Sequence, residues 1–404
     1  MLRNVRLLRM QAGPDMKLCA VIKADAYGHG ALGVSDLLTN FYTPSLPAPV
    51  ADMLAVATLE EALQLETVEV PTMILRPVEG VYIGQTRSLL EAAIRRGAIL
   101  SVTSVAGAQD VARLAAKLSV RANVQVMLDT GMNREMCEPE IFPELITAIR
   151  RDAALQLVAV GTHFTDGESD LEPFSDEQIR LFHDLIDPVL EDLPAGVIKH
   201  AANSGGTFFT SDDDLDMIRP GLALYGIDPS LGMSSGGEKT PEVTGEMHTE
   251  LRRQLRPVAK WTAPLLSVRD VPAGGSVGYG RTWIAKKPTR VGLIPVGYAD
   301  GYRRIWGNRA VVRVPAVASE HGQTGDAFCD VIGRVSMDYI TVDLTPAPWA
   351  EPGDEITLLD DEPKSLCSAA NLAELAGTIP YEIFCNIGPR VARVMVNPTD
   401  GETA

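Results

Sequence analysis

Short apolar runs alternate with helical stretches over the first 225 residues, and this alternation restricts the fold more than any other feature. One parallel strand can follow another only through a crossover connection, which is usually a helix. The pattern therefore predicts an α/β fold, a (β/α)8 barrel, although it also allows a doubly wound parallel sheet. The expected strands are residues 18–22, 53–57, 72–75, 99–102, 124–128, 158–162, 197–200 and 222–225. The expected helices are residues 59–66, 86–96, 105–118, 141–151 and 176–191.

The pattern changes near residue 228. Residues 228–250 are polar and rich in Gly, Ser, Thr and Glu, which is typical of a linker. Short β runs with turn signals follow at residues 265–268, 290–295, 310–314, 340–344 and 355–359, with one clear helix at 369–376. We therefore predict the barrel over residues 1–228 and an exposed, mobile linker over 229–254. A smaller, mostly antiparallel β domain is expected over 255–404.

The composition restricts the partners. A net charge of −17 argues against nucleic acid and anionic membranes, because both are bound through basic surfaces. No stretch approaches the roughly 20 apolar residues of a membrane span, and the N-terminus does not resemble a secretory signal. The 5 cysteines are scattered and the 6 histidines form no metal-binding pattern. We expect a cytoplasmic protein that acts on a small molecule and holds no structural metal.

Lys23 directly follows the apolar run of the first expected strand. Active sites of (β/α)8 barrels lie at the C-terminal ends of the strands, so this lysine falls where chemistry is expected. Apolar neighbours remove water from the amine and lower its pKa. A neutral amine can bond to an aldehyde cofactor and, once released, act as a base. An isolated lysine at a strand end is more often a surface residue whose stem covers apolar atoms.

Residues 23–30, KADAYGHG, resemble the cofactor-lysine signature of the alanine racemase family, the barrel class of pyridoxal-phosphate enzymes. Further segments that resemble the family follow in the same order. They are residues 129–134 (DTGMNR), 162–164 (THF), 200–204 (HAANS), 218–226 (IRPGLALYG), 277–283 (VGYGRTW), 295–302 (PVGYADGY), 333–338 (GRVSMD) and 380–382 (PYE). Nine such segments in the family's order favour a cofactor-binding role for Lys23 over a surface role.

The resemblance implies two bases on opposite faces of the substrate, Lys23 and Tyr279. Racemisation needs such a pair, because one group removes the α-proton and the other returns a proton from the far side. A tyrosine with a pKa of about 10 is a poor base at neutral pH. The resemblance implies that His163 lies beside Tyr279 and assists it. Without the motif, Tyr279 would be interpreted as a packed aromatic residue in a Gly-rich turn.

The resemblance also implies that Arg219 faces the ring nitrogen of pyridoxal 5'-phosphate. An arginine stays protonated, so it would leave that nitrogen without a proton and weaken the ring as an electron sink. The alternative is a surface salt bridge, since Asp212, Asp213, Asp214 and Asp216 lie just upstream. His200 is expected to orient its neighbours rather than to react.

The remaining implied contacts hold the cofactor phosphate and the substrate carboxylate. Hydroxyls and backbone N–H groups late in a barrel commonly bind phosphate. The residues implied for the phosphate are Tyr27, Ser204, Gly221, Leu222 and Tyr381. Arg134 and the backbone N–H of Met337 are implied for the carboxylate, and Arg134 and His163 also lie beside the cofactor. The alternative for Arg134 is an ion pair with Glu135 or Glu138.

Two features depart from the family. Relatives often have a carbamylated lysine that pairs with the arginine corresponding to Arg134, but Met127 occupies that position. The sequence also starts late, so we expect the second domain to lack an edge strand or the start to be incomplete.

The resemblance implies an alanine racemase that interconverts L- and D-alanine for peptidoglycan synthesis. It also implies a homodimer in which the partner subunit supplies the tyrosine base and the region of Met337. The alternatives are a racemase for serine or a broader range of amino acids, a non-catalytic pyridoxal-phosphate carrier, and a decarboxylase of the same architecture.

Overall fold

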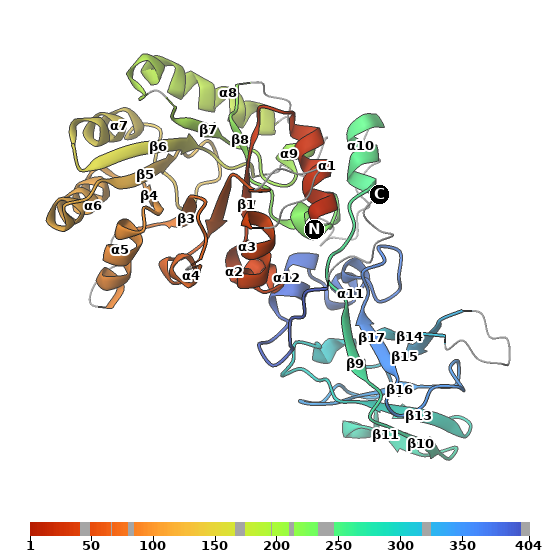
Figure 1. Cartoon of the computed structure of the whole chain (residues 1–404). Helices are drawn as coiled ribbons and strands as arrows, with labels where there is room; N and C mark the ends of the chain where they lie inside the picture. Colours follow the sequence, from red (N-terminus) through yellow and green to blue (C-terminus); the bar gives the residue numbers. More distant parts are fainter. Residues whose placement is uncertain are drawn as a thin grey trace.

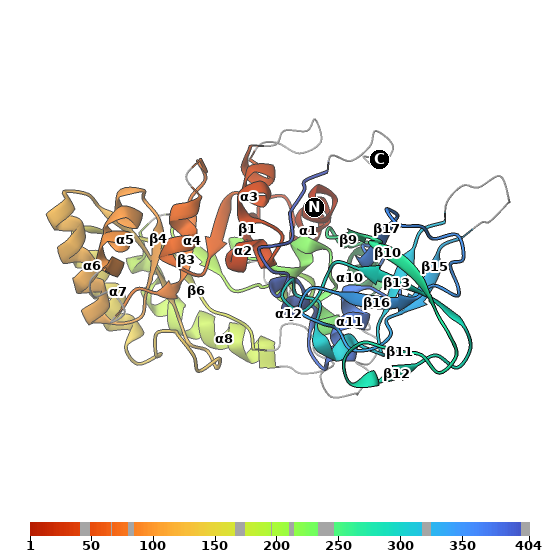
Figure 2. The same cartoon turned by 90° about the horizontal axis from the view of Figure 1, so that it is seen from below.

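The computed structural model describes residues 1–40, 49–65, 67–79, 85–165, 174–194, 196–209, 214–232, 246–316 and 325–396. The first half of the chain forms a barrel, and the second half forms a separate domain beside it (Figure 1). Figure 2 shows the two domains side by side, with α1 (Leu2–Ala12) and α12 (Pro380–Cys385) at their junction. None of the helices in the described residues is long and apolar enough to cross a bilayer.

Eight strands close into the barrel, and all their pairings are parallel. They are β1 (Lys17–Val21), β2 (Met53–Val56), β3 (Thr72–Pro77), β4 (Ile99–Val102), β5 (Ala122–Met127), β6 (Leu155–Gly161), β7 (Ile198–His200) and β8 (Met217–Ile218). The pairing of Leu18 with Ile218 joins β8 back to β1. This closure confirms the predicted barrel and excludes the doubly wound sheet.

Helices surround the barrel strands (Figures 1 and 2). They are α2 (Lys23–Tyr27), α3 (Ala31–Thr39), α4 (Leu59–Gln64), α5 (Gln85–Arg95), α6 (Val105–Leu118), α7 (Phe142–Arg151), α8 (Phe174–Ile186), η1 (Asp187–Asp192) and α9 (Gly206–Phe209). Side-chain capping fixes the first residue of at least two of these helices. The Ser104 side chain caps α6 by accepting from the backbone N–H of Gly107, and Thr58 with Glu61 forms a capping box on α4.

The eighth predicted strand, residues 222–225, is wrong. These residues form the 3-10 helix η2 (Leu222–Tyr225), and β8 lies just upstream. All four side chains are fully buried, and a short buried apolar run shows no periodicity that separates strand from helix. The correction matters because it places Arg219 at the end of the last strand rather than in a loop before it.

The second domain contains antiparallel sheets, as predicted. Its strands are β9 (Trp261–Pro264), β10 (Ser267–Val271), β11 (Ser276–Val277), β12 (Trp283–Ile284), β13 (Thr289–Ile294), β14 (Val311–Val314), β15 (Ala327–Asp330), β16 (Ile340–Asp343) and β17 (Glu355–Leu359). Its helices are η4 (Tyr279–Arg281), η5 (Arg304–Trp306), α11 (Ala369–Ala376) and α12. The sequence missed β9, β11, β12 and β15, which are two to four residues long.

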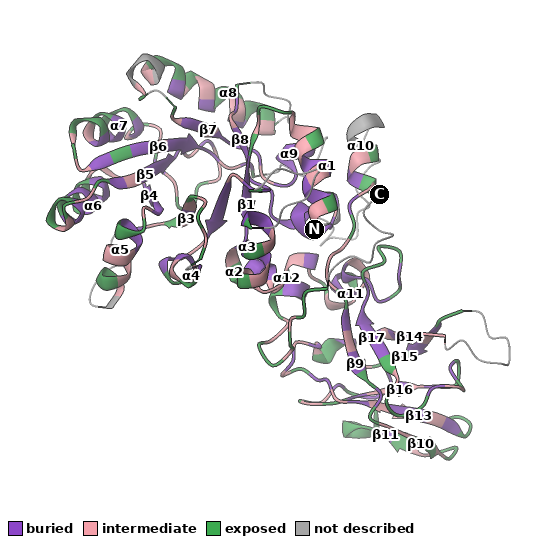
Figure 3. Cartoon of the chain, in the orientation of Figure 1, coloured by how far each residue is buried: buried purple, intermediate pink, exposed green. Residues whose placement is uncertain are grey.

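Each domain has its own hydrophobic core, and Figure 3 shows the burial along the barrel strands. Between the domains lie η3 (Pro229–Gly232) and α10 (Glu246–Arg253), so part of the expected linker is helical. The buried Arg252 of α10 pairs with Asp228 at 3.0 Å. Residues 233–245 lie outside the described residues, and the proposed domain boundaries stay a prediction.

Candidate active site

A pocket of about 450 Å3 opens at the C-terminal ends of the barrel strands. It contains every residue expected at the site except Tyr279 and Met337. These residues are Lys23, Tyr27, Arg134, His163, Ser204, Arg219, Gly221, Leu222 and Tyr381. All but Tyr381 follow barrel strands, whereas Tyr381 reaches the pocket from α12 of the second domain. The residues that this rule singled out at the ends of the strands therefore lie together in one pocket.

Lys23 lies just after β1 and is half-buried. Burial lowers the pKa of its amine from the ordinary 10.5, and the guanidinium of Arg134 lowers it further. The carboxylates of Glu135 and Glu61 oppose this shift of the pKa but do not cancel it. The pKa of Lys23 therefore shifts downward, as the sequence predicted. A lysine in this state reaches its reactive neutral form more readily than a surface lysine does.

The backbone after Lys23 forms a left-handed turn. Ala24, Asp25, Ala26 and Tyr27 have φ of 53–54°, and Gly28 has φ of 78°. A left-handed helical conformation costs an L-residue about 1–2 kcal/mol, so four consecutive non-glycine residues in it require external support. Gly28 fits because a side chain there would lie 2.1 Å from the carbonyl oxygen of Phe384. The motif around Lys23 therefore has an unusual backbone that its sequence did not reveal.

Arg219 is a buried cation at the end of β8, with 4% of its surface exposed. Its guanidinium donates to the carbonyl oxygen of Thr162 at 2.9 Å and contacts Nδ1 of His200. Burial lowers the pKa of Arg219 to about 10, which leaves it protonated at neutral pH. The surface salt bridge considered for Arg219 is therefore wrong; Asp216 instead accepts from the backbone N–H of Lys199 at 2.7 Å.

His163 and His200 are neutral neighbours of Arg219. Nδ1 of His163 lies 3.1 Å from the Arg219 guanidinium, which can only donate, so this nitrogen accepts. Burial and then the positive charges of Arg219, Lys23 and Arg134 lower the pKa of His163 to about 3. Burial and Arg219 also hold the pKa of His200 well below its usual value. The contact of His200 with Arg219 suits the orienting role expected for it.

Sequence reasoning missed Gln178, a fully buried side chain on α8. Its amide donates to the carbonyl oxygen of His163 at 3.1 Å and to the hydroxyl of Thr130 at 3.2 Å. Its carbonyl oxygen accepts from the backbone N–H of Thr165 at 2.9 Å. Gln178 therefore ties together the loops after β5 and β6. A glutamine within an expected helix carries no sequence signal for this role.

Hydroxyls and backbone N–H groups line one end of the pocket. The hydroxyl of Ser204 accepts from the N–H groups of Gly221 at 2.9 Å and Ala223 at 3.2 Å. A side chain on Gly221 would lie 2.3 Å from the Tyr27 hydroxyl, so only glycine leaves that space open. The rings of Tyr27 and Tyr381 are 5.8 Å apart. This donor set, close to an amine of lowered pKa, fits the phosphate and aldehyde ends of pyridoxal 5'-phosphate.

Met127 and Arg134 form another part of the pocket wall. Met127 ends β5 with 6% of its surface exposed and offers no amine to carbamylate. Arg134 is ion-paired through Nε to the carboxylate of its neighbour Glu135, which is the local pairing considered for it. Arg134 still lines the pocket, so the ion pair and a substrate-facing position are compatible.

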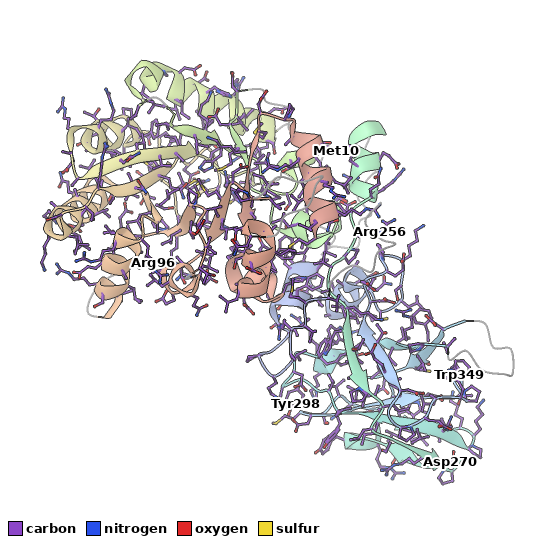
Figure 4. All side chains as sticks on the ribbon, in the orientation of Figure 1. Met10, Arg96, Arg256, Asp270, Tyr298 and Trp349 are labelled. Atoms are coloured by element: carbon purple, nitrogen blue, oxygen red, sulfur yellow. The ribbon has the colours of Figure 1, made fainter. Side chains whose placement is uncertain are left out.

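Tyr279 and Met337 lie in the second domain, outside the barrel pocket. Tyr279 is 72% exposed and borders a hollow of about 380 Å3 with Gly278, Arg334, Ser336, Tyr339 and Thr341. Met337 is 52% exposed, and its carbonyl oxygen accepts from the N–H of Ala299. Tyr298, labelled in Figure 4, lies at the edge of the same domain. Within one chain, Tyr279 therefore shares a pocket with neither Lys23 nor His163.

Comparisons with known proteins agree with this architecture. The family profile "Alanine racemase, N-terminal domain" matches residues 1–229, and "Alanine racemase, C-terminal domain" matches residues 258–395. An alanine racemase of Treponema denticola is 31% identical over 98% of this chain and 96% of its own length. The solved alanine racemase of Clostridium difficile 630 is 29% identical, with a TM-score of 0.79 over 96% of this chain and 92% of that chain.

A third relative bears on the cofactor. The alanine racemase of Bartonella henselae, solved with covalently bound pyridoxal phosphate, is 27% identical. Its TM-score is 0.75, and the match covers 98% of this chain and 96% of that chain. The two profiles together span most of the sequence, and the relatives match over nearly their full lengths. The chain therefore belongs to the alanine racemase family of amino-acid racemases.

Proposed function

We propose that this chain is a pyridoxal 5'-phosphate-dependent alanine racemase that interconverts L- and D-alanine. The observation that carries the proposal is the barrel pocket, which combines Lys23, the buried Arg219 and the hydroxyl and amide cradle at Ser204 and Gly221. Lys23 would hold the cofactor, and Tyr27, Ser204, Gly221, Leu222 and Tyr381 would hold its phosphate. Family membership and the cofactor of the Bartonella henselae relative support this assignment.

When bound, pyridoxal 5'-phosphate would acidify the α-C–H bond of the amino acid by withdrawing its electrons. Lys23 would take or return the α-proton on one face, because its lowered pKa makes the neutral amine accessible. Arg219 has no acceptor atom, so it would leave the ring nitrogen unprotonated and moderate the electron withdrawal. Arg134 would attract the substrate carboxylate together with the N–H of Met337.

We propose Tyr279 of the partner subunit as the base on the opposite face. Tyr279, Tyr298, Met337 and Tyr339 are all exposed in the single chain, and exposed aromatic clusters commonly mark association surfaces. Most homodimers have twofold symmetry, so each chain can complete the pocket of the other. In that arrangement His163 would approach Tyr279 across the interface. The D-alanine produced would supply peptidoglycan synthesis.

The pocket wall favours a broader substrate range as the second candidate. Met127, Met132, Met136 and Leu75 line the pocket near Arg134. Methionine side chains adapt to irregular shapes, so this wall could accept side chains larger than a methyl group. One additional methylene changes discrimination in an apolar pocket by only about 1–3 kcal/mol.

Chiral analysis of a panel of L-amino acids tests both candidates. The cofactor-loaded protein is incubated with each amino acid, and the D-product is measured over time. The proposal requires D-alanine to form fastest and to approach equality with the L form. Faster racemisation of serine or a larger substrate would support the broader range. Bound cofactor without any D-product would instead indicate a carrier.

A further inference from the structure

The left-handed turn after Lys23 is stabilised partly from within. The N–H of Ala26 donates to the carbonyl oxygen of Ile22 at 2.8 Å, and that of Gly28 donates to Ala24 at 2.9 Å. These bonds close the turn but do not include the N–H of Ala24, which begins it. A group outside the turn is needed to fix the first peptide after the lysine.

Glu61 supplies that group from the neighbouring strand–helix unit. Its Oε1 accepts from the N–H of Ala24 at 2.6 Å. Its Oε2 accepts from the N–H of Ala57 at 2.7 Å and from that of Thr58 at 3.1 Å. The segments meet because β1 and β2 are adjacent and in register. One carboxylate therefore ties the backbone after β1, next to Lys23, to the backbone after β2.

Two functions of Glu61 can be separated in the structure. The contact of Oε2 with Thr58 belongs to the capping box, in which the Thr58 hydroxyl also accepts from the N–H of Glu61. The contact of Oε1 with Ala24 contributes nothing to the helix cap. It spans 37 positions of sequence and reaches the residue after the lysine. Capping of α4 therefore does not account for the contact between Glu61 and Ala24.

Glu61 also belongs to the set of charges around the lysine amine. The groups that interact with this amine are Arg134, Glu135, Glu61, Cys385 and His163. Glu61 and Glu135 raise the pKa of Lys23, against the larger effects of burial and Arg134. Glu135 is itself ion-paired to Arg134. Glu61 instead accepts only backbone N–H bonds among the contacts described, so its charge is less offset.

We propose that Glu61 is a positioning residue for Lys23, which it holds at the pocket by anchoring the N–H of Ala24 at the start of the left-handed turn. The inference rests on the proposed role of Lys23 as the reactive amine. It adds a residue from the second strand–helix unit, and this residue does not line the pocket.

The test compares the Glu61→Gln variant with the full-length wild-type chain. A glutamine can accept at one of the two sites, but its NH2 group opposes an N–H donor at the other, and the charge is lost. In protein freed of cofactor, acetylation of Lys23 by acetic anhydride is followed against pH by mass spectrometry. We expect the midpoint of labelling to move to lower pH, because a charge that raises the pKa of Lys23 has been removed.

Turnover of the cofactor-loaded protein provides the second measurement. We expect kcat of Glu61→Gln to fall by up to about a hundredfold, because displacing a reacting group by about 1 Å can cost that much. The KM should change little, because Glu61 does not line the pocket. Glu61→Asp keeps the charge but shortens the reach, so it should lose kcat with a smaller shift of the labelling midpoint.

Two control variants separate positioning from charge and from helix capping. Glu60→Gln removes the same charge from the adjacent exposed residue of α4, and it should leave both measurements at wild-type values. Thr58→Ala weakens the cap but leaves the Ala24 contact, so it should lower only thermal stability. If Glu61→Gln matches Glu60→Gln, or Thr58→Ala reproduces its effects, the inference is wrong. Labelling requires no turnover, so a failure of the racemase proposal itself would be recognised separately.

Discussion

The barrel pocket and the hollow around Tyr279 differ in nearly every physical respect. At the pocket, the buried guanidinium of Arg219 donates to backbone carbonyl oxygens and contacts His163 and, behind the pocket wall, His200. Lys23 lines the same pocket with a lowered pKa. In the second domain, Tyr279 is mostly exposed and lies beside further exposed side chains. A reactive group in water lacks the low-dielectric surroundings that tune a buried one. Under the proposed function, one chain would therefore assemble the cofactor side of the site and leave Tyr279, the proposed opposite base, without its final environment.

The most direct way to break this comparison is to remove each of the two proposed bases, Lys23 and Tyr279, in a separate variant. Lys23→Ala and Tyr279→Phe should each lower kcat by about 10²-fold to 10⁴-fold, as expected for loss of a general base. Tyr279→Phe should retain the cofactor, because Tyr279 lies outside the pocket. Spectra of the bound cofactor and assays of D-alanine formation measure these effects.

Mixed dimers of those two variants then test whether the site is shared. If the bases come from different chains, a mixed dimer contains one intact site, formed by Lys23 of one chain and Tyr279 of the other. Random exchange of equal amounts should restore about a quarter of wild-type activity. No restoration, after exchange is verified by mass spectrometry, would mean that each chain uses its own Tyr279.

A second prediction concerns Arg393, which connects the end of the second domain to the turn beside Lys23. Its Nε donates to the carbonyl oxygen of Gly28 at 2.9 Å, and its other nitrogens donate to Ile387, Gly388 and Val391 at 2.6 Å each. Arg393→Ala should lower the free energy of unfolding by about 2 kcal/mol, because charge-assisted bonds to four carbonyl oxygens are lost. Urea denaturation measures the change.

Arg393→Lys is the matched control for that experiment. A lysine keeps the charge but lacks the planar fork that reaches several carbonyl groups at once. We therefore expect it to recover only a small part of the stability. Full recovery would show that the charge, rather than the geometry of the guanidinium, fixes the segment beside Gly28.

The sequence predicted residues that follow strands better than residues that support them. Lys23, His163, Ser204 and Arg219 could be found because each stands near the end of an apolar run and within a recognisable motif. The error at residues 222–225 arose because burial on all sides removes the periodicity that identifies a strand. The two-residue β8 is too short to have a periodicity of its own.

The supporting residues were missed for a different physical reason. Glu61, Gln178 and Arg393 act through backbone atoms far away in the sequence, and a backbone N–H or carbonyl group looks the same in every residue. The left-handed turn was equally hidden, because Ala24 and Ala26 normally favour right-handed conformations. Tertiary contacts impose this backbone, and no local pattern records them.

The last prediction concerns His29, which packs behind the turn. Its ring stacks on Tyr225 with centroids 4.4 Å apart, and Nδ1 lies 3.0 Å from the carbonyl oxygens of Ala26 and Tyr27. Burial lowers the pKa of His29 from 6.5 to about 4, although the two backbone contacts act in the opposite direction. The folded chain therefore keeps this ring neutral at a pH where the unfolded chain protonates it.

Between pH 6.5 and 4, the unfolded state binds more protons at His29 than the folded state does, so stability should fall as the pH is lowered. One such group contributes a slope of up to about 1.4 kcal/mol per pH unit. His29→Gln should reduce the slope of unfolding free energy against pH by about this amount, as measured by urea denaturation at several pH values. An unchanged slope would mean that His29 is protonated in the folded chain. The region behind the barrel pocket would then be more hydrated than the burial of His29 indicates.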